Sequence, residues 1–318
     1  MSKKPKVGMW SGLTAVTAVL TAGAIVGTTV AFHYTTTVNN YLDADTYKII
    51  RGDSDEDTEY FKSDFTSDEE RESYEAELCA QVEAEGAALL KNDNNALPLA
   101  SGAKVSLFGH GSVDLMYGGT GSGSVDTSKA PNFKQALEDQ GIQVNSTLWD
   151  LYSSDDMMKN YSRITPAAIS DTLEANTQYA VNEAPWSKLS SAESSFADYG
   201  DAAIVVFSRS GGEGADLPSG ENGTNDSWIK GQEGDGNYLA LSAEEKELLQ
   251  NLKTLKDNGT FKKIIVLINS SNAIEMDFLN PEICGEDYGI DSAMWIGDVG
   301  QTGINGVAQL LAGEVTPS

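Results

Sequence analysis

The residues with the clearest chemical potential lie in segment 203–218, AIVVFSRSGGEGADLP, where an apolar run leads directly into a glycine-rich loop. Glu213 stands between two glycines, so its carboxyl group is free to reach a substrate, as a general acid or base must. Asp216, three residues on, is expected to accept a hydrogen bond that orients the loop. Asp216 and Gly212 are both predicted to bind substrate. Because acidic residues and glycines are also common in solvated loops, a loop without catalytic function is the alternative.

A second glycine-rich loop, YGGTGSG at residues 117–123, also follows a predicted strand. It is expected either to be a surface loop with unusual backbone angles or to let the backbone approach a ligand, with Gly119 as the contact. Gly109 and Gly111 could begin a dinucleotide-binding loop, but Asp114 occupies the place of the third glycine. The chain also lacks a Gly-Lys-Ser/Thr motif, so we expect no nucleotide cofactor.

The charge of the chain narrows the choice of ligands. With 48 acidic and 21 basic residues the net charge is -27, so the surface repels nucleic acids and anionic lipids, and nucleic acid is excluded as a partner. His33 and His110 have no companions at metal-ligand spacing, so no metal site is predicted. Neutral ligands remain compatible with this charge. Tryptophans more often pack in cores, but Trp228, in the loop after Glu213, is a candidate for stacking on a sugar ring.

The elements that must position these loops alternate from residue 104 onward between apolar runs and amphipathic segments. Continuous β-branched runs between amphipathic helices predict an α/β fold with a mostly parallel sheet sandwiched by helices. Ligand-binding groups are expected at the C-terminal ends of such strands. The predicted strands are residues 105–109, 142–148, 202–209, 263–270 and 292–298.

Amphipathic helices are predicted around this sheet. One lies within residues 66–93, where Ser67 and Glu70 have the spacing of a capping box. Its apolar face is expected to consist of Leu78, Val82 and Leu89. Another begins at Ser242, which forms a second capping box with Glu245. This second pattern covers residues 241–259, and two further helical patterns occupy residues 130–141 and 302–313.

The N-terminal residues predict a membrane anchor. Lys3, Lys4 and Lys6 precede residues 7–32, an uncharged run longer than the ~20 residues needed to cross a bilayer. A secretory signal peptide has a shorter apolar region of about 7–15 residues and is the less favoured alternative. Basic residues before the span place the N-terminus in the cytoplasm and the rest of the chain outside the cell. The expected organisation is a tail and single-pass anchor at 1–33, an acidic stalk at 34–66 and the α/β domain at 67–318.

Five stretches of the chain resemble the C-terminal-type α/β sandwich domain of glycoside hydrolase family 3. SRSGGEGADLP, residues 208–218, is similar to the family's acid/base segment. EGAALLKNDNNALPL resembles its helix-to-loop segment, and VSLFG followed by YGGTGSG resembles its first strand and glycine loop. LSAEEKELLQNL is similar to its Leu-Ser-x-x-Glu helix, and GEVTPS to its closing motif. The five stretches keep the family's order over about residues 69–318.

The resemblance implies that Glu213 is the acid/base of a retaining, β-glucosidase-like hydrolase that needs no cofactor. In the family, the sandwich packs beside a (β/α)8 barrel that supplies the nucleophilic aspartate. Here an anchor and stalk precede the domain, as in members whose barrel comes second, and the chain stops at VTPS, where the family continues with Gly-Arg-Leu-Pro. We therefore expect an incomplete hydrolase whose partners are a carbohydrate substrate and a barrel.

Two expectations follow for the chain on its own. Glu213, without a partner surface, should titrate near the ordinary value of about 4.3 and remain ionised. Since a retaining glycosidase needs two carboxyl groups across the scissile bond, the chain alone should not turn over glycosides. The alternative function is a non-catalytic carbohydrate-binding or accessory module at the cell surface.

Overall fold

The computed structural model describes residues 7–42, 61–164, 179–213 and 237–318. The chain divides into two compact units, Met1–Ser63 and Asp64–Ser318. The predicted substrate-binding residues Asp216 and Trp228 lie outside the described residues.

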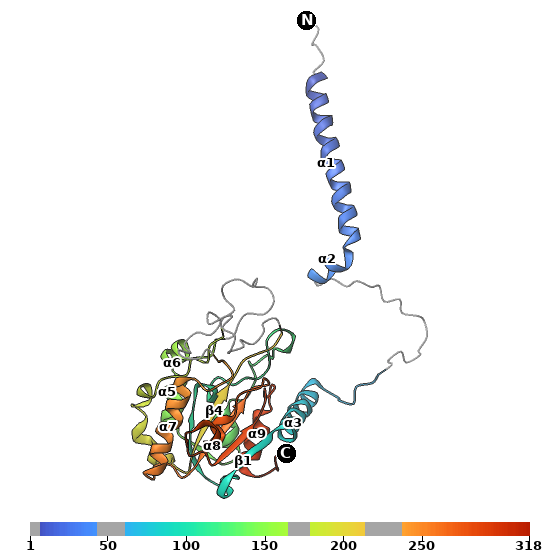
Figure 1. Ribbon diagram of the computed structural model, residues 1–318. Helices are drawn as coiled ribbons and strands as arrows, with labels where there is room; N and C mark the ends of the chain where they lie inside the picture. Colours follow the sequence, from blue (N-terminus) through green and yellow to red (C-terminus); the bar gives the residue numbers. More distant parts are fainter. Residues whose placement is uncertain (1–6, 43–60, 165–178, 214–236) are drawn as a thin grey trace. The chain divides into compact units, whose positions relative to one another are not determined.

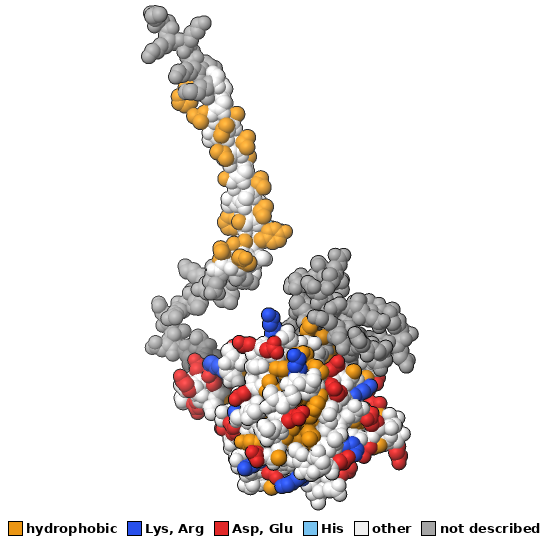
Figure 2. Space-filling model, turned by 90° about the vertical axis from the view of Figure 1, so that its left-hand side faces the viewer, with side chains coloured by type: hydrophobic (Ala, Val, Ile, Leu, Met, Phe, Trp, Pro, Cys, Tyr) orange, Lys and Arg blue, Asp and Glu red, His pale blue; other side chains and the backbone are white. Residues whose placement is uncertain are grey.

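The N-terminal unit contains a long apolar helix, α1 (Val7–His33). At 1.5 Å per residue its 27 residues extend roughly 40 Å, more than the ~30 Å hydrocarbon core of a bilayer. Figure 2 shows hydrophobic side chains along α1 and no charged ones. The stretch Trp10–His33 is long and apolar enough to span a membrane, and its length and composition fit a signal sequence equally. A short helix, α2 (Thr35–Tyr41), follows within the predicted stalk, where no helix was expected.

The second unit is built on a six-stranded sheet with the order β1-β6-β5-β4-β2-β3. All neighbouring strands are parallel except β1, which pairs antiparallel with β6. The predicted mostly parallel sheet is confirmed. The strands are β1 (Ala88–Asn92), β2 (Lys104–Phe108), β3 (Gln143–Val144), β4 (Ala202–Ser208), β5 (Ile264–Asn269) and β6 (Ser292–Trp295).

Helices cover both faces of this sheet, which explains why residues 202–207 of β4 and 264–268 of β5 are apolar without interruption. In β4, Ile204 and Val206 join one core cluster, whereas Val205 and Phe207 join the other. Figure 1 shows α3 and α9 on one side of the strands and α5 and α7 on the other. The helices of this unit are α3 (Asp68–Gly86), α4 (Phe133–Asp139), α5 (Ser146–Tyr152), α6 (Asp155–Asn160), α7 (Ala243–Asp257), α8 (Pro281–Cys284) and α9 (Ile304–Ala312).

The prediction for residues 66–93 was wrong in two respects. The helix α3 ends at Gly86, and the residues that follow form the edge strand β1, which the sequence pattern did not separate from the helix. Leu78 and Val82 are exposed, at 43% and 63%, whereas the buried face consists of Ala80 and Ala84. Small residues are required there because α9 packs closely: a Cβ atom at Gly306 would lie 2.1 Å from the carbonyl oxygen of Ala80.

The caps of α3 and α7 test the two predicted capping boxes. The Ser67 hydroxyl accepts the Glu70 N–H at 3.1 Å, but the Glu70 carboxylate accepts the N–H of Thr66 rather than that of Ser67, so the box is only half formed. At α7, Ser242 and Glu245 bond reciprocally, at 2.8 and 3.2 Å, and this prediction is confirmed.

The strand predicted at residues 142–148 is reduced to Gln143–Val144. Its second half instead begins helix α5, because the buried side chain of Asn145 caps that helix and accepts the N–H of Leu148 at 3.3 Å. The β-branched appearance of this segment therefore reflected a very short edge strand followed by a capping asparagine.

Candidate active site

Two loops meet at the C-terminal edge of the sheet, because β2 and β4 are parallel neighbours and their chains leave in the same direction. The loop after β4 carries Gly212 and Glu213, and the loop after β2 carries Thr120. Thr120 and Gly212 form a parallel β-bridge, in which the Thr120 N–H donates to the Gly211 carbonyl at 3.4 Å. The two glycine-rich segments singled out in the sequence therefore form one site.

The carboxylate of Glu213 is docked on this second loop. Its Oε2 accepts the backbone N–H of Ser122 at 2.8 Å and, in addition, the hydroxyl of Ser122. The Thr120 hydroxyl donates to the Glu213 carbonyl oxygen at 2.9 Å. The hydroxyl and then the amide of Ser122 lower the pKa of Glu213 below its ordinary value, because both hydrogen bonds favour the ionised form. Glu213 is ionised as expected, but the expected ordinary pKa is wrong.

The glycines of both loops permit this close approach. Gly212 has a φ of 151°, and a Cβ atom there would lie 2.4 Å from the Thr120 nitrogen. A Cβ atom at Gly121 would lie 2.7 Å from the Glu213 Cβ. Gly119 is placed similarly, since its Cβ would lie 3.2 Å from the Gly211 carbonyl oxygen. Gly121 leaves room for the Glu213 side chain, and the carboxyl group contacts Ser122.

A buried arginine fixes the start of the Glu213 loop. Arg209 is fully buried and makes a two-pronged ion pair with Glu245, with distances of 2.8 and 2.7 Å. Its remaining donors bond to the carbonyl oxygens of Tyr238, Ala240 and Ser208. The Tyr238 hydroxyl accepts the Ser210 N–H at 2.9 Å. The chain before Gly211 is therefore anchored to the residues near α7.

A buried asparagine fixes the start of the partner loop. Asn269, at the end of β5, accepts the N–H of Met116 at 2.6 Å and donates to the Met116 carbonyl oxygen at 3.0 Å. Its amide also donates to the Gly297 carbonyl oxygen at 2.7 Å. The Asn269 side chain thus bonds the loops that follow β2 and β6 to the end of β5.

A cavity of about 470 Å³ opens beside the two loops, and Gly119 and Thr120 form part of its wall. Tyr117 and Arg163 also line it. Arg163 pairs with Asp114 at 3.2 Å, and its Nε atom is buried without a hydrogen-bond partner. The lining of the cavity mixes polar and apolar residues, and Thr120, which bonds to the Glu213 carbonyl oxygen, connects it with the Glu213 loop.

His110 takes no part in this arrangement. Its buried ring nitrogen Nδ1 lies 3.0 Å from Oε2 of Glu183, which also accepts the backbone N–H of His110 at 2.9 Å. The His110 side chain is therefore buried and paired inside the domain. Within the described residues, no group of three or more His, Cys, Asp or Glu could hold a metal ion.

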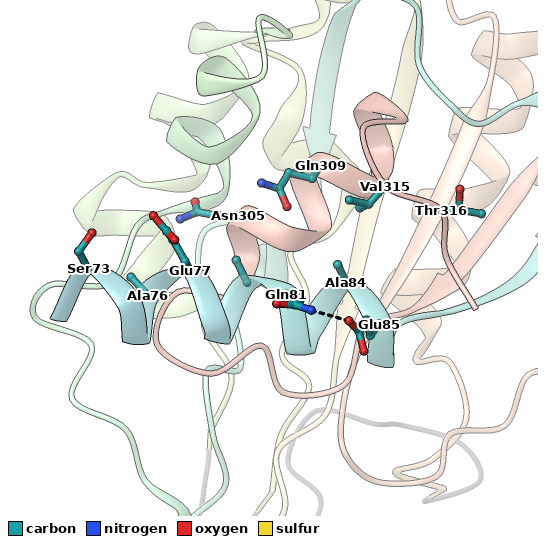
Figure 3. A pocket seen from close by; sticks show the side chains of 11 residues that line it. Ser73, Ala76, Glu77, Gln81, Ala84, Glu85, Asn305, Gln309, Val315 and Thr316 are labelled. Carbon is teal, nitrogen blue, oxygen red and sulfur yellow. Dashed lines mark hydrogen bonds between the residues drawn. The ribbon is translucent and has the colours of Figure 1, made fainter. Parts of the chain in front are cut away.

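Another cavity, of about 630 Å³, lies between α3 and α9. Figure 3 shows Glu77 of α3 on one side of it and Asn305 and Gln309 of α9 on the other, while Gln81 donates to Glu85 along α3. It shares no lining residue with the Glu213 loops, and alanines of α3 form much of its wall. Nothing in its chemistry connects it with catalysis.

The sequence profile of the glycosyl hydrolase family 3 C-terminal domain matches residues 87–318. A mostly parallel sheet between helices, with a carboxylate loop at its C-terminal edge, agrees with that class of domain. The chain belongs to glycoside hydrolase family 3, as the five motifs predicted.

Similar proteins are β-glucosidases. The chain is 30% identical over 244 residues to a β-glucosidase of Ruminococcus albus, covering 76% of this chain and 22% of the relative. It is 30% identical over 259 residues to β-glucosidase A of Butyrivibrio fibrisolvens, covering 76% and 27%. The chain therefore spans about a quarter of the length of these relatives.

Solved structures of β-glucosidases share the fold. That of Paenibacillus barengoltzii is 28% identical with a TM-score of 0.56, covering 76% of this chain and 23% of that one. That of β-glucosidase 3B from Thermotoga neapolitana in complex with α-D-glucose is 25% identical with a TM-score of 0.55, covering 77% and 30%. The similarity again covers the α/β domain and a minor part of each larger enzyme.

Sequence reasoning missed Thr120 and Ser122 as partners of Glu213. Both lie in the glycine loop that was singled out, and their hydroxyls among glycines were the available signal. The contact itself depends on the adjacency of β2 and β4 in the sheet, although β3 lies between them in the chain. Arg209 and Asn269 were missed because a polar residue at the end of a strand does not reveal its partner.

Proposed function

We propose that this chain supplies the acid/base domain of a retaining, β-glucosidase-like glycoside hydrolase, with Glu213 as the proton donor. The observation that carries the proposal is the position of Glu213, which is exposed after the C-terminal end of β4 and contacts a second loop, part of which lines a cavity. Gly119, Gly212, Asp216 and Trp228 are the proposed substrate-binding residues around it.

The chemistry assigned to Glu213 has two steps. Its protonated carboxyl group gives a proton to the glycosidic oxygen as the bond from that oxygen to the anomeric carbon breaks. The resulting carboxylate then takes a proton from a water molecule whose oxygen attacks the same carbon and releases the glycosyl group from the nucleophile. Each step needs Glu213 to change its protonation state.

A second carboxylate must attack the anomeric carbon, about 5–5.5 Å from the first. Among the described residues, the groups that bond to the Glu213 carboxylate are the hydroxyl and amide of Ser122, and no second carboxyl group acts on it. We assign the nucleophile to a (β/α)8 barrel, the domain with which family members pair this one. Contact with the barrel would remove water from Glu213 and raise its pKa toward the range of a working acid.

The test combines the full chain with a separately produced family barrel. Glu213→Gln should reduce turnover of a glucoside with a poor leaving group by roughly 10²–10⁴-fold, the usual contribution of a general acid. An activated aryl glucoside should lose less, because its leaving group needs little protonation. Glu193→Gln is the matched control, since Glu193 is exposed and precedes β4, at the opposite end of the strand. Full activity of Glu213→Gln on both substrates would refute the proposal.

One observation favours the alternative of a non-catalytic carbohydrate-binding module. Glu213 is ionised and doubly hydrogen-bonded in the chain alone, which suits a hydrogen-bond acceptor for sugar hydroxyls better than it suits an acid. In that case the chain by itself should bind glucose or cellobiose in isothermal titration calorimetry, and adding the barrel should produce no Glu213-dependent turnover.

We further infer that α1 anchors the chain in a membrane with the α/β domain outside the cell. Support comes from the lysines at positions 3, 4 and 6 before the apolar helix and from the acidic residues after it. Protease added to intact cells should then remove the α/β domain and leave a short protected N-terminal fragment. Recovery of the intact, processed domain in the medium would instead identify α1 as a cleaved signal sequence.

A further inference from the structure

We propose that Ser122 is a positioning residue for Glu213. In the free domain the Thr120–Gly123 turn holds the Glu213 carboxylate through hydrogen bonds, an arrangement that we call the clamp, and a bound glycoside replaces Ser122 as the partner of the carboxyl group. The inference rests on the proposed function for its catalytic meaning, but the clamp is a property of the chain alone.

Three contacts make the clamp. The hydroxyl and amide of Ser122 both bond to the same oxygen, Oε2, of Glu213. The Thr120 hydroxyl holds the Glu213 carbonyl oxygen at 2.9 Å, so the backbone and the side chain of the glutamate are both fixed. The β-bridge between Thr120 and Gly212 aligns the two loops. Together these contacts leave the Glu213 carboxylate one definite position on an otherwise exposed loop.

The fit between the two loops is specific. Gly121 has a φ of 67°, and a Cβ atom there would lie 2.7 Å from both Cβ and Oε2 of Glu213. The turn therefore accommodates the glutamate side chain only because residue 121 is glycine. The Gly121 carbonyl oxygen accepts the N–H of Ser124 at 3.1 Å, which closes the turn behind Ser122.

The surroundings show that the clamp acts through hydrogen bonds rather than through charge. Among the described residues, Arg163 and Asp114, which line the adjacent cavity, pair with each other at 3.2 Å. No described side chain forms an ion pair with Glu213, and the Ser122 hydroxyl is the leading cause of its lowered pKa. The clamp therefore favours the ionised form of Glu213, and the acid step requires that the clamp be released.

A glycosidic oxygen and Ser122 compete for the same carboxyl group. In this proposal the transferred proton is carried on Oε2, the oxygen to which both Ser122 groups donate, so that protonation displaces one of these two hydrogen bonds. Once the proton has left, Ser122 again donates its hydrogen bonds to the Glu213 carboxylate. This assigns to Ser122 an influence on the pH profile of the enzyme rather than a direct part in bond breaking.

The decisive measurement is made on the full chain in detergent, without a barrel. Carboxyl-labelled ¹³C-glutamate gives a titration curve for Glu213, assigned as the resonance that Glu213→Gln removes. Ser122→Ala should move this titration to higher pH, Ser122→Thr should restore it, and the control Ser124→Ala should leave it unchanged. Ser124 is a fair control because it lies in the same loop and is exposed. An unchanged Glu213 titration in Ser122→Ala would overturn the proposal.

A second measurement uses the chain with a family barrel. In Ser122→Ala the limb of the kcat/KM profile that belongs to Glu213 should move to higher pH, whereas a purely structural defect would lower activity at all pH values equally. The two proposals fail separately. If Ser122→Ala moves the Glu213 titration but Glu213→Gln retains full turnover, the clamp stands and the catalytic assignment falls.

Discussion

Glu83 should make the stability of this protein fall as the pH rises. Its carboxyl group lies at the end of α3 beneath the loop that joins β6 to α9, and its Oε1 atom is buried without a hydrogen-bond partner. Burial first, and the nearby carboxylate of Asp298 second, raise the pKa of Glu83 to about 8. In the unfolded chain the same group titrates near 4.5. Between these two pH values the folded state holds a proton that the unfolded state does not.

The sign of the effect follows from that difference. Because the folded state binds more protons, the free energy of unfolding decreases with increasing pH from about 4.5 to about 8 and then levels off. At 1.36 kcal/mol per pKa unit, the upper limit of the loss is about 5 kcal/mol. Rotation of the carboxylate toward water reduces the cost, and we expect roughly 1–3 kcal/mol.

The perturbation is Glu83→Gln, which keeps the shape and removes the titration. Urea unfolding of the full chain in detergent, followed by tryptophan fluorescence at pH 5.5, 7 and 9, should show little change at pH 5.5 and a more stable variant at pH 9. Glu85→Gln, two residues away and exposed, should follow the wild type at each pH. Equal pH dependence in Glu83→Gln and the wild type would refute the reasoning.

Two further predictions concern the supports of the Glu213 loop. Glu245→Ala leaves the buried Arg209 charge unpaired and should cost about 3–5 kcal/mol in urea unfolding, against less than about 1 kcal/mol for its partly exposed neighbour Glu244→Ala; similar losses in both would show that the ion pair contributes little. Gly212→Ala places a methyl group against Thr120 and should speed hydrogen exchange at the Thr120 amide. The midpoint of thermal unfolding should fall by no more than a few degrees. Unchanged exchange would show that the β-bridge tolerates a side chain at position 212.

Much of the fold was predictable because local patterns and the sheet agree. The run 202–207 is apolar at consecutive positions, as is typical of a strand covered on both faces. Ser242 and Glu245 formed the predicted capping box because both partners lie within one helical turn. Ala80 and Ala84 were not recognised as the buried face of α3, because their burial depends on the close approach of α9 more than 200 residues along the chain.

Part of the candidate site was likewise predictable from the sequence, and part depended on the fold. The sequence alone identified Glu213, the glycines beside it and the loop at 117–123, since these depend on residue type and on position after a strand. It could not show that the two loops touch, because the order of strands in the sheet is set by packing between distant segments. Only the tertiary structure placed Ser122 on the Glu213 carboxylate and so decided that this group is hydrogen-bonded to a second loop, which lowers its pKa. Because a hydrogen bond requires its two atoms to lie about 3 Å apart, residues as distant in the sequence as Ser122 and Glu213 form one only when folding brings their loops together.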